Sequence, residues 1–211
     1  MPKKLIIDAD PGIGDALAVA LAMLDPEVDL IAVTATAGCV SGPTASRNLQ
    51  TVVELIDPPK WPRLGASDAL LPCPGGDLTR GYVDPVLLNG KTGLGDSSVP
   101  VAELHKPHDA VKLLTEQVRL FPGEVTLLTL GPLTNVLSAQ ERDPEFLSLL
   151  RGIVCLGGSM SVGGDATAAA EFNIFADPEA AQTVLKYPAT KSLVPLDTSA
   201  LFEPLRGRQR Y

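Results

Sequence analysis

The chain has 211 residues, of which 45% are hydrophobic and 20% are charged, a composition typical of a soluble protein with a sizeable core. Its formal net charge of -8 disfavours a nucleic-acid partner, because binding to a phosphate backbone requires a basic face. Three scattered cysteines, and the lack of an apolar run long enough for a signal peptide or a membrane span, predict a cytoplasmic protein without a membrane partner.

Strand-like and helix-like segments alternate along the chain, which predicts an α/β fold with a doubly wound, mostly parallel open sheet. Continuous apolar runs predict buried strands, and one-sided apolar spacing predicts the helix at about residues 43–56. The predicted strands are residues 5–7, 30–33, 125–130, 153–156 and 192–196, and the predicted helices are residues 16–24, about 43–56 and about 109–120. Residues 64–101 are rich in Gly, Pro and Asp and are expected to form long loops.

The first predicted strand is followed by three carboxylates, Asp8, Asp10 and Asp15, just before the first predicted helix. Asp8 and Asp10 point the same way if the strand continues, and Asp15 returns from the first helical turn. Converging like charges require a counterion, and oxygen ligands favour Ca²⁺ or Mg²⁺ over zinc. Any one Asp could simply accept backbone amides or complement the helix dipole. For three of them around Pro11-Gly12, we favour a cation site.

Polar or glycine-rich turns also follow the other predicted strands. They include Gly131-Pro-Leu-Thr-Asn135, Gly157-Gly158 and Asp197-Thr198. Because the carboxyl ends of parallel strands meet at one edge of a sheet, we expect these turns to form one polar, acidic pocket.

Two other site types share part of this pattern. Gly12-Ile-Gly-Asp-Ala-Leu17 follows the dinucleotide fingerprint except that Leu17 replaces the third glycine, and the nearby carboxylates would repel a pyrophosphate. A dehydrogenase is therefore disfavoured. The Asp8-x-Asp10 pair is also similar to that of haloacid dehalogenase-type phosphatases. Those proteins usually continue with Thr or Val, whereas Pro11-Gly12 follows here, so a phosphatase is the less favoured alternative.

Sequence blocks in a fixed order resemble the inosine-uridine preferring nucleoside hydrolase family, from Lys3 to about Thr198. The blocks are Asp8-Ala-Asp-Pro-Gly-Ile-Gly-Asp-Ala16, Gly131-Pro-Leu-Thr-Asn135, Ala170-Glu-Phe-Asn173 and Asp177-Pro-Glu-Ala-Ala181. The resemblance implies a Rossmann-like nucleoside hydrolase fold and Ca²⁺-dependent hydrolysis of the N-glycosidic bond of a ribonucleoside, giving ribose and a free base for purine or pyrimidine salvage. It also allows a homo-oligomer.

Carried over by position, the resemblance assigns roles to the floor of the pocket. Asp10 and Asp15 would bind Ca²⁺ together with the backbone carbonyl of Leu130. Asp10 would also orient and deprotonate the attacking water, and Asp8 would support this arrangement. A metal that lowers the pKa of water and a carboxylate that accepts its proton suit an oxocarbenium-like transition state.

The resemblance also assigns substrate-binding residues. Glu171 and Asn173 would hold the ribose hydroxyls. Cys39 and Asp165 stand where family members usually carry Asn, and both are expected at the substrate. Gly14 stands where a second Asp usually contacts the ribose, so that hydrogen-bond acceptor is missing.

Further departures concern histidines and the end of the chain. A histidine often found between Asn89 and Gly95 is absent, and His105 and His108, beside a predicted helix start, are expected at the surface. Family members continue beyond Tyr211 with another Asp ligand and a His that protonates the leaving base. The resemblance therefore implies that residues 1–211 form a single domain, incomplete at its C-terminus, covering about two-thirds of the family's domain. The alternative is a truncated or degenerate member that binds metal or ribosides without turnover.

Overall fold

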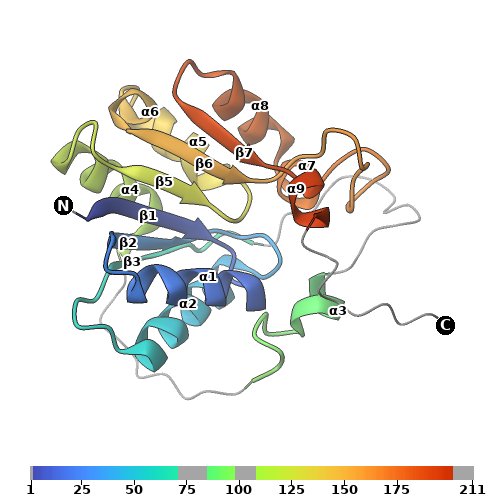
Figure 1. Cartoon of the computed structure of the whole chain (residues 1–211), viewed down its shortest axis with the longest axis horizontal. Helices are drawn as coiled ribbons and strands as arrows, with labels where there is room; N and C mark the ends of the chain where they lie inside the picture. The colour runs from blue at the N-terminus through green and yellow to red at the C-terminus, as the bar shows by residue number, and fades with distance from the viewer. Residues whose placement is uncertain (1, 71–84, 98–107, 202–211) are drawn as a thin grey trace.

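The structure, a computed structural model, describes residues 2–70, 85–97 and 108–201. A seven-stranded sheet with strand order β4-β3-β2-β1-β5-β6-β7 forms its centre, and all its pairings are parallel (Figure 1). The strands are β1 Lys3–Ala9, β2 Val28–Ala35, β3 Arg63–Ala66, β4 His108–Asp109, β5 Thr126–Thr129, β6 Gly152–Leu156 and β7 Lys191–Val194. The helices are α1 Ile13–Leu24, α2 Gly42–Ile56, α3 Pro85–Asn89, α4 Ala110–Leu120, α5 Thr134–Arg142, α6 Phe146–Leu149, α7 Phe172–Ala176, α8 Pro178–Lys186 and α9 Leu196–Ala200. The predicted α/β class and parallel open sheet are confirmed.

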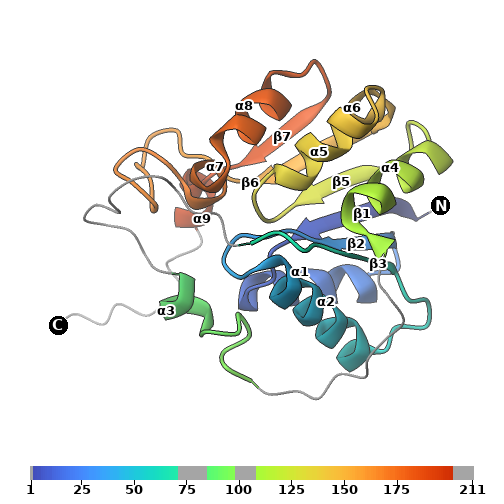
Figure 2. The same cartoon turned by 180° about the vertical axis from the view of Figure 1, so that it is seen from behind.

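Two apolar cores lie on opposite faces of the sheet because consecutive strand side chains alternate between its faces. Ile6 is fully buried in a cluster with side chains of α4, α5, α6 and α8, which lie toward the viewer in Figure 2. Ile7 is fully buried in a second cluster with side chains of α1 and α2. Burial on both faces explains why the N-terminal strand reads as a continuous apolar run.

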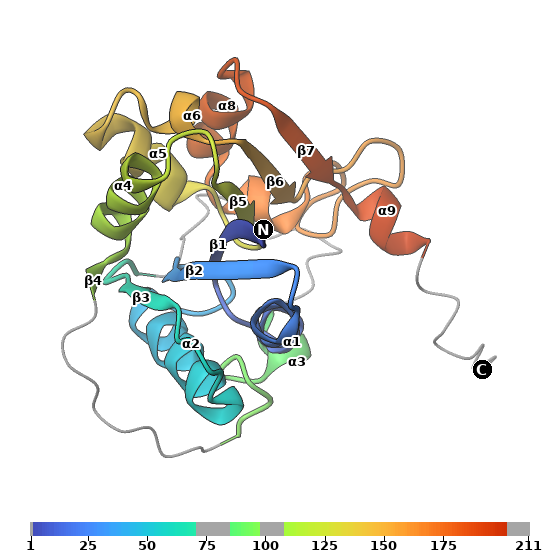
Figure 3. The same cartoon turned by 60° about the vertical axis from the view of Figure 1, so that its left-hand side comes forward.

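Helices of the described chain cover the α1 face unevenly. In Figure 1 the β5–β7 part of this face has no described helix in front of it, and Figure 3 shows α1 end-on below β2. α1 also presents an apolar stripe outward. The exposed fractions in this stripe are 50% for Ile13, 62% for Leu17, 60% for Leu21 and 64% for Leu24. Among the described residues, no helix combines the length and the apolar character that a bilayer crossing requires.

Several sequence-based boundaries differ from the structure. Residues 64–101 were expected to be loops, but β3 reaches Ala66 and α3 occupies Pro85–Asn89, so this expectation is wrong in both places. Residues 71–84 and 98–101, like His105, lie outside the described residues. His108 is exposed, as expected, and it forms the short edge strand β4. The predicted strand 192–196 ends at Val194, because α9 begins at Leu196.

Candidate active site

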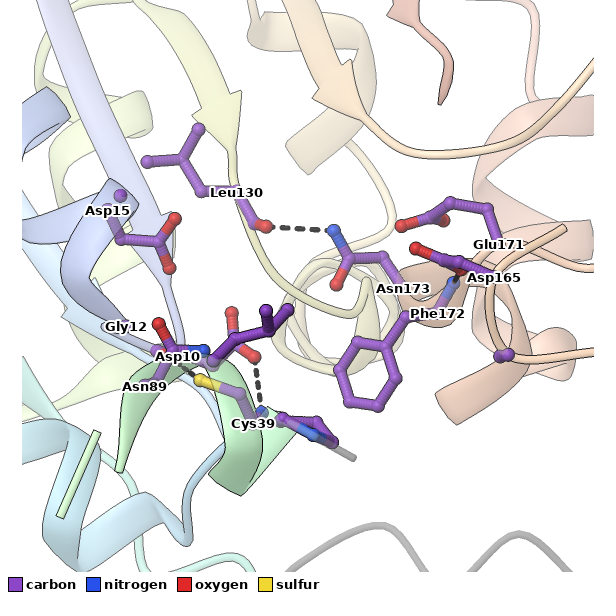
Figure 4. A pocket seen from close by; sticks show the side chains of 14 residues that line it. Asp10, Gly12, Asp15, Cys39, Asn89, Leu130, Asp165, Glu171, Phe172 and Asn173 are labelled. Carbon is purple, nitrogen blue, oxygen red and sulfur yellow. Dashed lines mark hydrogen bonds between the residues drawn. The ribbon is translucent and has the colours of Figure 1, made fainter. Parts of the chain in front are cut away.

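A cavity of about 320 Å³ opens beyond the carboxyl ends of β1, β2 and β5 (Figure 4). Its lining residues are Asp10, Gly12, Gly14, Asp15, Cys39, Pro85, Leu88, Asn89, Leu130, Asp165, Ala166, Glu171, Phe172 and Asn173. This volume is at the lower end of the range of small-molecule sites. The position matches the predicted edge of the sheet, where open α/β sheets bind their ligands.

Two carboxylates lie together at one side of this cavity. Asp10 follows β1 and is only 4% exposed, and Asp15 lies in the first turn of α1. Burial and the neighbouring charge of Asp15 raise the pKa of Asp10 well above its ordinary value. Burial also raises the pKa of Asp15 to about 7. None of the described lining residues is Lys, Arg or His, so no basic side chain of this lining balances the pair.

Neighbouring residues pack closely around the Asp10 side chain. The Cys39 amide donates to Asp10 Oδ2 at 2.5 Å, and Cys39 Sγ donates to the Asp10 backbone oxygen at 2.6 Å. A Cβ atom on Gly38 would lie 1.9 Å from Asp10 Oδ2, and one on Gly131 would lie 2.5 Å from Oδ1. Burial and the charges of Asp10 and Asp15 raise the pKa of the Cys39 thiol, which therefore stays protonated. Glycine at positions 38 and 131 thus makes room for the carboxylate.

Asp8 does not line the cavity, so the expectation that all three carboxylates converge is wrong for this residue. β1 continues to Ala9, so the alternation of its side chains directs Asp8 toward α5. Asp10 lies beyond the end of this strand, where the chain turns at Pro11. Asp8 Oδ1 accepts hydrogen bonds from Thr34 Oγ1 at 2.5 Å and from Asn135 Nδ2 at 2.9 Å. Complete burial raises the pKa of Asp8 to about 7.

The polar side chains of the opposite wall include Glu171 and Asn173, which lie at the start of α7 (Figure 4). Asn173 Nδ2 donates to the backbone oxygens of Leu130 at 2.8 Å and of Leu156 at 3.0 Å, which directs its Oδ1 toward the cavity. Glu171 caps α7, and its Oε2 accepts amides of Gly158 at 2.9 Å and Ile174 at 3.2 Å. Burial raises the pKa of Glu171.

Asp165 reaches the same wall from the preceding loop. Its Oδ1 accepts the amide of Phe172 at 2.8 Å, and both residues line the cavity. The structure therefore brings together every site residue expected from the sequence except Asp8, in two groups that face each other. Asp10, Asp15, Cys39 and Leu130 form one side, and Asp165, Glu171 and Asn173 form the other.

The first group provides oxygen donors that fit a hard cation. The carboxylates of Asp10 and Asp15 and the backbone oxygen of Leu130 are of the type that Ca²⁺ prefers, and the uncompensated pair favours a positive charge. Within the described residues, no group of three or more His, Cys, Asp or Glu side chains could hold a single ion. Because Ca²⁺ takes about six to eight ligands, this part of the chain supplies only some of them.

Comparison with known proteins assigns the chain to a family. Residues 5–209 match the sequence model of the inosine-uridine preferring nucleoside hydrolase family. The chain belongs to this nucleoside hydrolase family. Membership leaves the phosphatase alternative without support.

Curated members of the nucleoside hydrolase family are similar over nearly the whole chain. Uridine nucleosidase 1 of Arabidopsis thaliana is 40% identical over 91% of this chain and 56% of its own length. The inosine-uridine preferring nucleoside hydrolase of Crithidia fasciculata is 34% identical over 93% of this chain and 61% of its own. The chain thus spans less than two-thirds of these relatives.

Solved nucleoside hydrolase structures share the fold of this chain. A plant nucleoside hydrolase is 36% identical, with a TM-score of 0.79 over 93% of this chain and 61% of that one. An inosine-guanosine nucleoside hydrolase is 29% identical, with a TM-score of 0.80 over 95% of this chain and 64% of that one.

Sequence reasoning missed part of the cavity wall. Pro85, Leu88 and Asn89 line the cavity from α3, a helix that the sequence reading placed within long loops. The run of Gly, Pro and Asp around this helix indicated loops. The residues of α3 reach the site because this segment packs against the start of α1 in the tertiary fold. Phe172 was also missed, although it lies between two predicted substrate residues.

Proposed function

We propose that the chain carries the catalytic carboxylates of a Ca²⁺-dependent nucleoside hydrolase, which breaks the N-glycosidic bond of a ribonucleoside to give ribose and a free base. The observation that supports this most directly is the Asp10–Asp15 pair, in which Asp10 is buried and Asp15 partly buried, without a basic partner in the described lining and opposite Glu171 and Asn173. The names of the relatives, nucleosidases and nucleoside hydrolases, support the same reaction.

Asp10 is proposed as the general base. When bound by Asp10, Asp15 and the Leu130 carbonyl, Ca²⁺ would neutralise the carboxylate pair and lower the pKa of a nearby water. The Cys39 amide occupies Asp10 Oδ2 and fixes the orientation of the side chain. Asp10 then orients the attacking water and accepts its proton.

Glu171 and Asn173 are proposed to hold the ribose. Asn173 Nδ2 and Glu171 Oε2 form hydrogen bonds with backbone groups. Asn173 Oδ1 and the other carboxylate oxygen of Glu171 are therefore left for substrate hydroxyls. Asp165, fixed by the Phe172 amide, adds a carboxylate to the same wall. Oxygen atoms held around the sugar favour the positive charge that develops as the glycosidic bond breaks.

A non-catalytic member that binds a metal or a riboside is the second candidate. Two observations favour it: the described residues supply only part of a Ca²⁺ ligand set, and Gly14 places no side chain at the cavity. This candidate predicts thermal stabilisation by Ca²⁺ and nucleoside together, without release of base.

Calorimetric titration with Ca²⁺ tests the proposed cation site. The unaltered chain is expected to bind Ca²⁺, and Asp15→Asn is expected to weaken binding at least about tenfold, because it removes one of two charged ligands. Asp25→Asn, an exposed substitution just beyond the other end of α1, is the matched control and should leave binding unchanged. Equal Ca²⁺ binding by the Asp15 variant and the unaltered chain would contradict the assignment.

A further inference from the structure

The turn that carries Asp10 and Asp15 lacks a capping side chain of its own. α1 begins after Gly12, which occupies the N-cap position and makes no side-chain hydrogen bond. The first amides of a helix have no partner within the helix, so an acceptor must come from elsewhere. Any group that supplies it also fixes the start of α1, where Asp15 lies.

Asn89, the last residue of α3, supplies this acceptor. Its Oδ1 accepts the amide of Ile13 at 3.0 Å from a position 76 residues further along the chain. A Cβ atom on Gly12 would lie 2.6 Å from Asn89 Oδ1 and 2.8 Å from its amide carbon. Glycine at position 12 therefore lets the Asn89 side chain pack directly against the turn.

Asn48 of α2 holds the same turn from the other side. It is only 5% exposed, and its Nδ2 donates to the backbone oxygens of Pro11 at 3.1 Å and of Thr92 at 2.8 Å. One side-chain amide thus joins the turn to the segment that follows α3. Residues 85–97 are attached to the Asp10–Asp15 turn at two points.

Gly12 links these contacts to the cation site. Its backbone N–H donates a hydrogen bond to the Asp15 carboxylate, and the same residue packs against Asn89. A displacement of Asn89 would therefore move both the Ile13 amide and the backbone group that holds Asp15. Because Pro85, Leu88 and Asn89 also line the cavity, contact between a substrate and this wall would reach the carboxylates through the same path.

We propose that Asn89 is a positioning residue, which through Gly12 and Ile13 sets Asp15 against Asp10 for cation binding, with Asn48 as the second anchor. The inference rests on the proposed Ca²⁺ site. Substitutions of groups that orient metal ligands typically weaken metal affinity about 10- to 100-fold. Asn89 is expected to have an effect of this kind without being a ligand.

Calorimetric titration with Ca²⁺ on three variants of the full chain tests this role. Asn89→Ala removes the acceptor and is expected to raise the Kd for Ca²⁺ about tenfold or more. Asn89→Asp keeps an acceptor at a helix N-terminus and should bring the Kd back to within about threefold of the unaltered chain. Leu87→Ala, on the same helix but 81% exposed and outside the cavity lining, should leave the Kd unchanged.

Amide hydrogen exchange gives a second measurement, which does not depend on a loaded enzyme. Exchange at Ile13 should become faster in Asn89→Ala and stay slow in Asn89→Asp, while the melting temperature shows that each variant is folded. Ca²⁺ binding that is unchanged in Asn89→Ala, or equally weak in both Asn89 variants, would overturn this inference alone. If the unaltered chain failed to bind Ca²⁺, the proposed function and this inference would both be wrong.

Discussion

At the residue scale, the position of Asp10 depends on glycines that leave space for its carboxylate. Gly38→Ala would place a Cβ atom 1.9 Å from Asp10 Oδ2, so either the side chain or the backbone must move. We expect the free energy of unfolding to fall by about 1–3 kcal/mol, as for other overpacked sites, and Ca²⁺ binding to weaken. Urea denaturation and calorimetric titration measure the two effects.

Gly14→Ala is the opposite case. A Cβ atom on Gly14 meets nothing within 4 Å, and the residue lies within α1. Alanine in a helix is more favourable than glycine, so the free energy of unfolding should rise by up to about 1 kcal/mol. A loss of stability in urea denaturation, comparable to that of Gly38→Ala, would contradict this account of the two positions.

The residues of the site could be predicted from the sequence only where their order along the chain carries information. Asp10 and Asp15 lie between a predicted strand and a predicted helix, whereas Glu171 and Asn173 were expected from the ordered motifs of the family resemblance, and all four line the cavity. The position of Asp8 was not predictable, because it depends on where β1 ends. Contacts such as that of Asn89 with Ile13 depend on the tertiary fold and leave no local pattern.

At the element scale, Asp197 at the start of α9 holds the loop that follows β6. It accepts the Met160 amide at 2.8 Å, the Ser161 amide at 2.9 Å and the Ser161 hydroxyl at 2.5 Å. The Ser161 hydroxyl, followed by these amides, lowers the pKa of Asp197 from 3.8 to about 2. A lowered pKa in the folded state means that Asp197 stabilises the fold above its unfolded pKa and loses this contribution on protonation.

Asp197→Asn should therefore change how stability depends on pH. The unaltered chain is expected to be more stable than the variant at neutral pH, and the difference should shrink as the pH falls from about 4 to about 2. Urea denaturation at several pH values measures this difference. A difference that stays constant down to pH 2 would show that the Asp197 charge does not contribute.

Longer elements were easier to predict from the sequence than short ones. The apolar periodicity of α2 predicted this helix to within one or two residues, and the expected bounds of α4 were equally close. The four- and five-residue helices α6, α7 and α9 are too short to show a periodicity. β3 has four residues in a stretch rich in loop-forming residues, and its strand state depends on pairing with β2.

At the scale of the whole molecule, the larger core fixes the sheet against α4, α5, α6 and α8. Phe146 is fully buried there, and Phe146→Ala is expected to lower the free energy of unfolding by about 3–5 kcal/mol through lost burial and a residual cavity. Leu87→Ala, at an 81% exposed position, should change it by less than about 0.5 kcal/mol. Similar urea denaturation curves for the two variants would contradict the assigned core.

The central claim is that the Asp10–Asp15 pair takes part in hydrolysis of a ribonucleoside, and product release tests it most directly. Free base and reducing sugar are measured after incubation of the chain with uridine or inosine, with Ca²⁺ and after its removal by a chelator. The account predicts release of both products only with Ca²⁺, and a rate at least about a hundredfold lower in Asp10→Asn, which removes the general base. No release with Ca²⁺ bound, or equal rates in the variant and the unaltered chain, would contradict it.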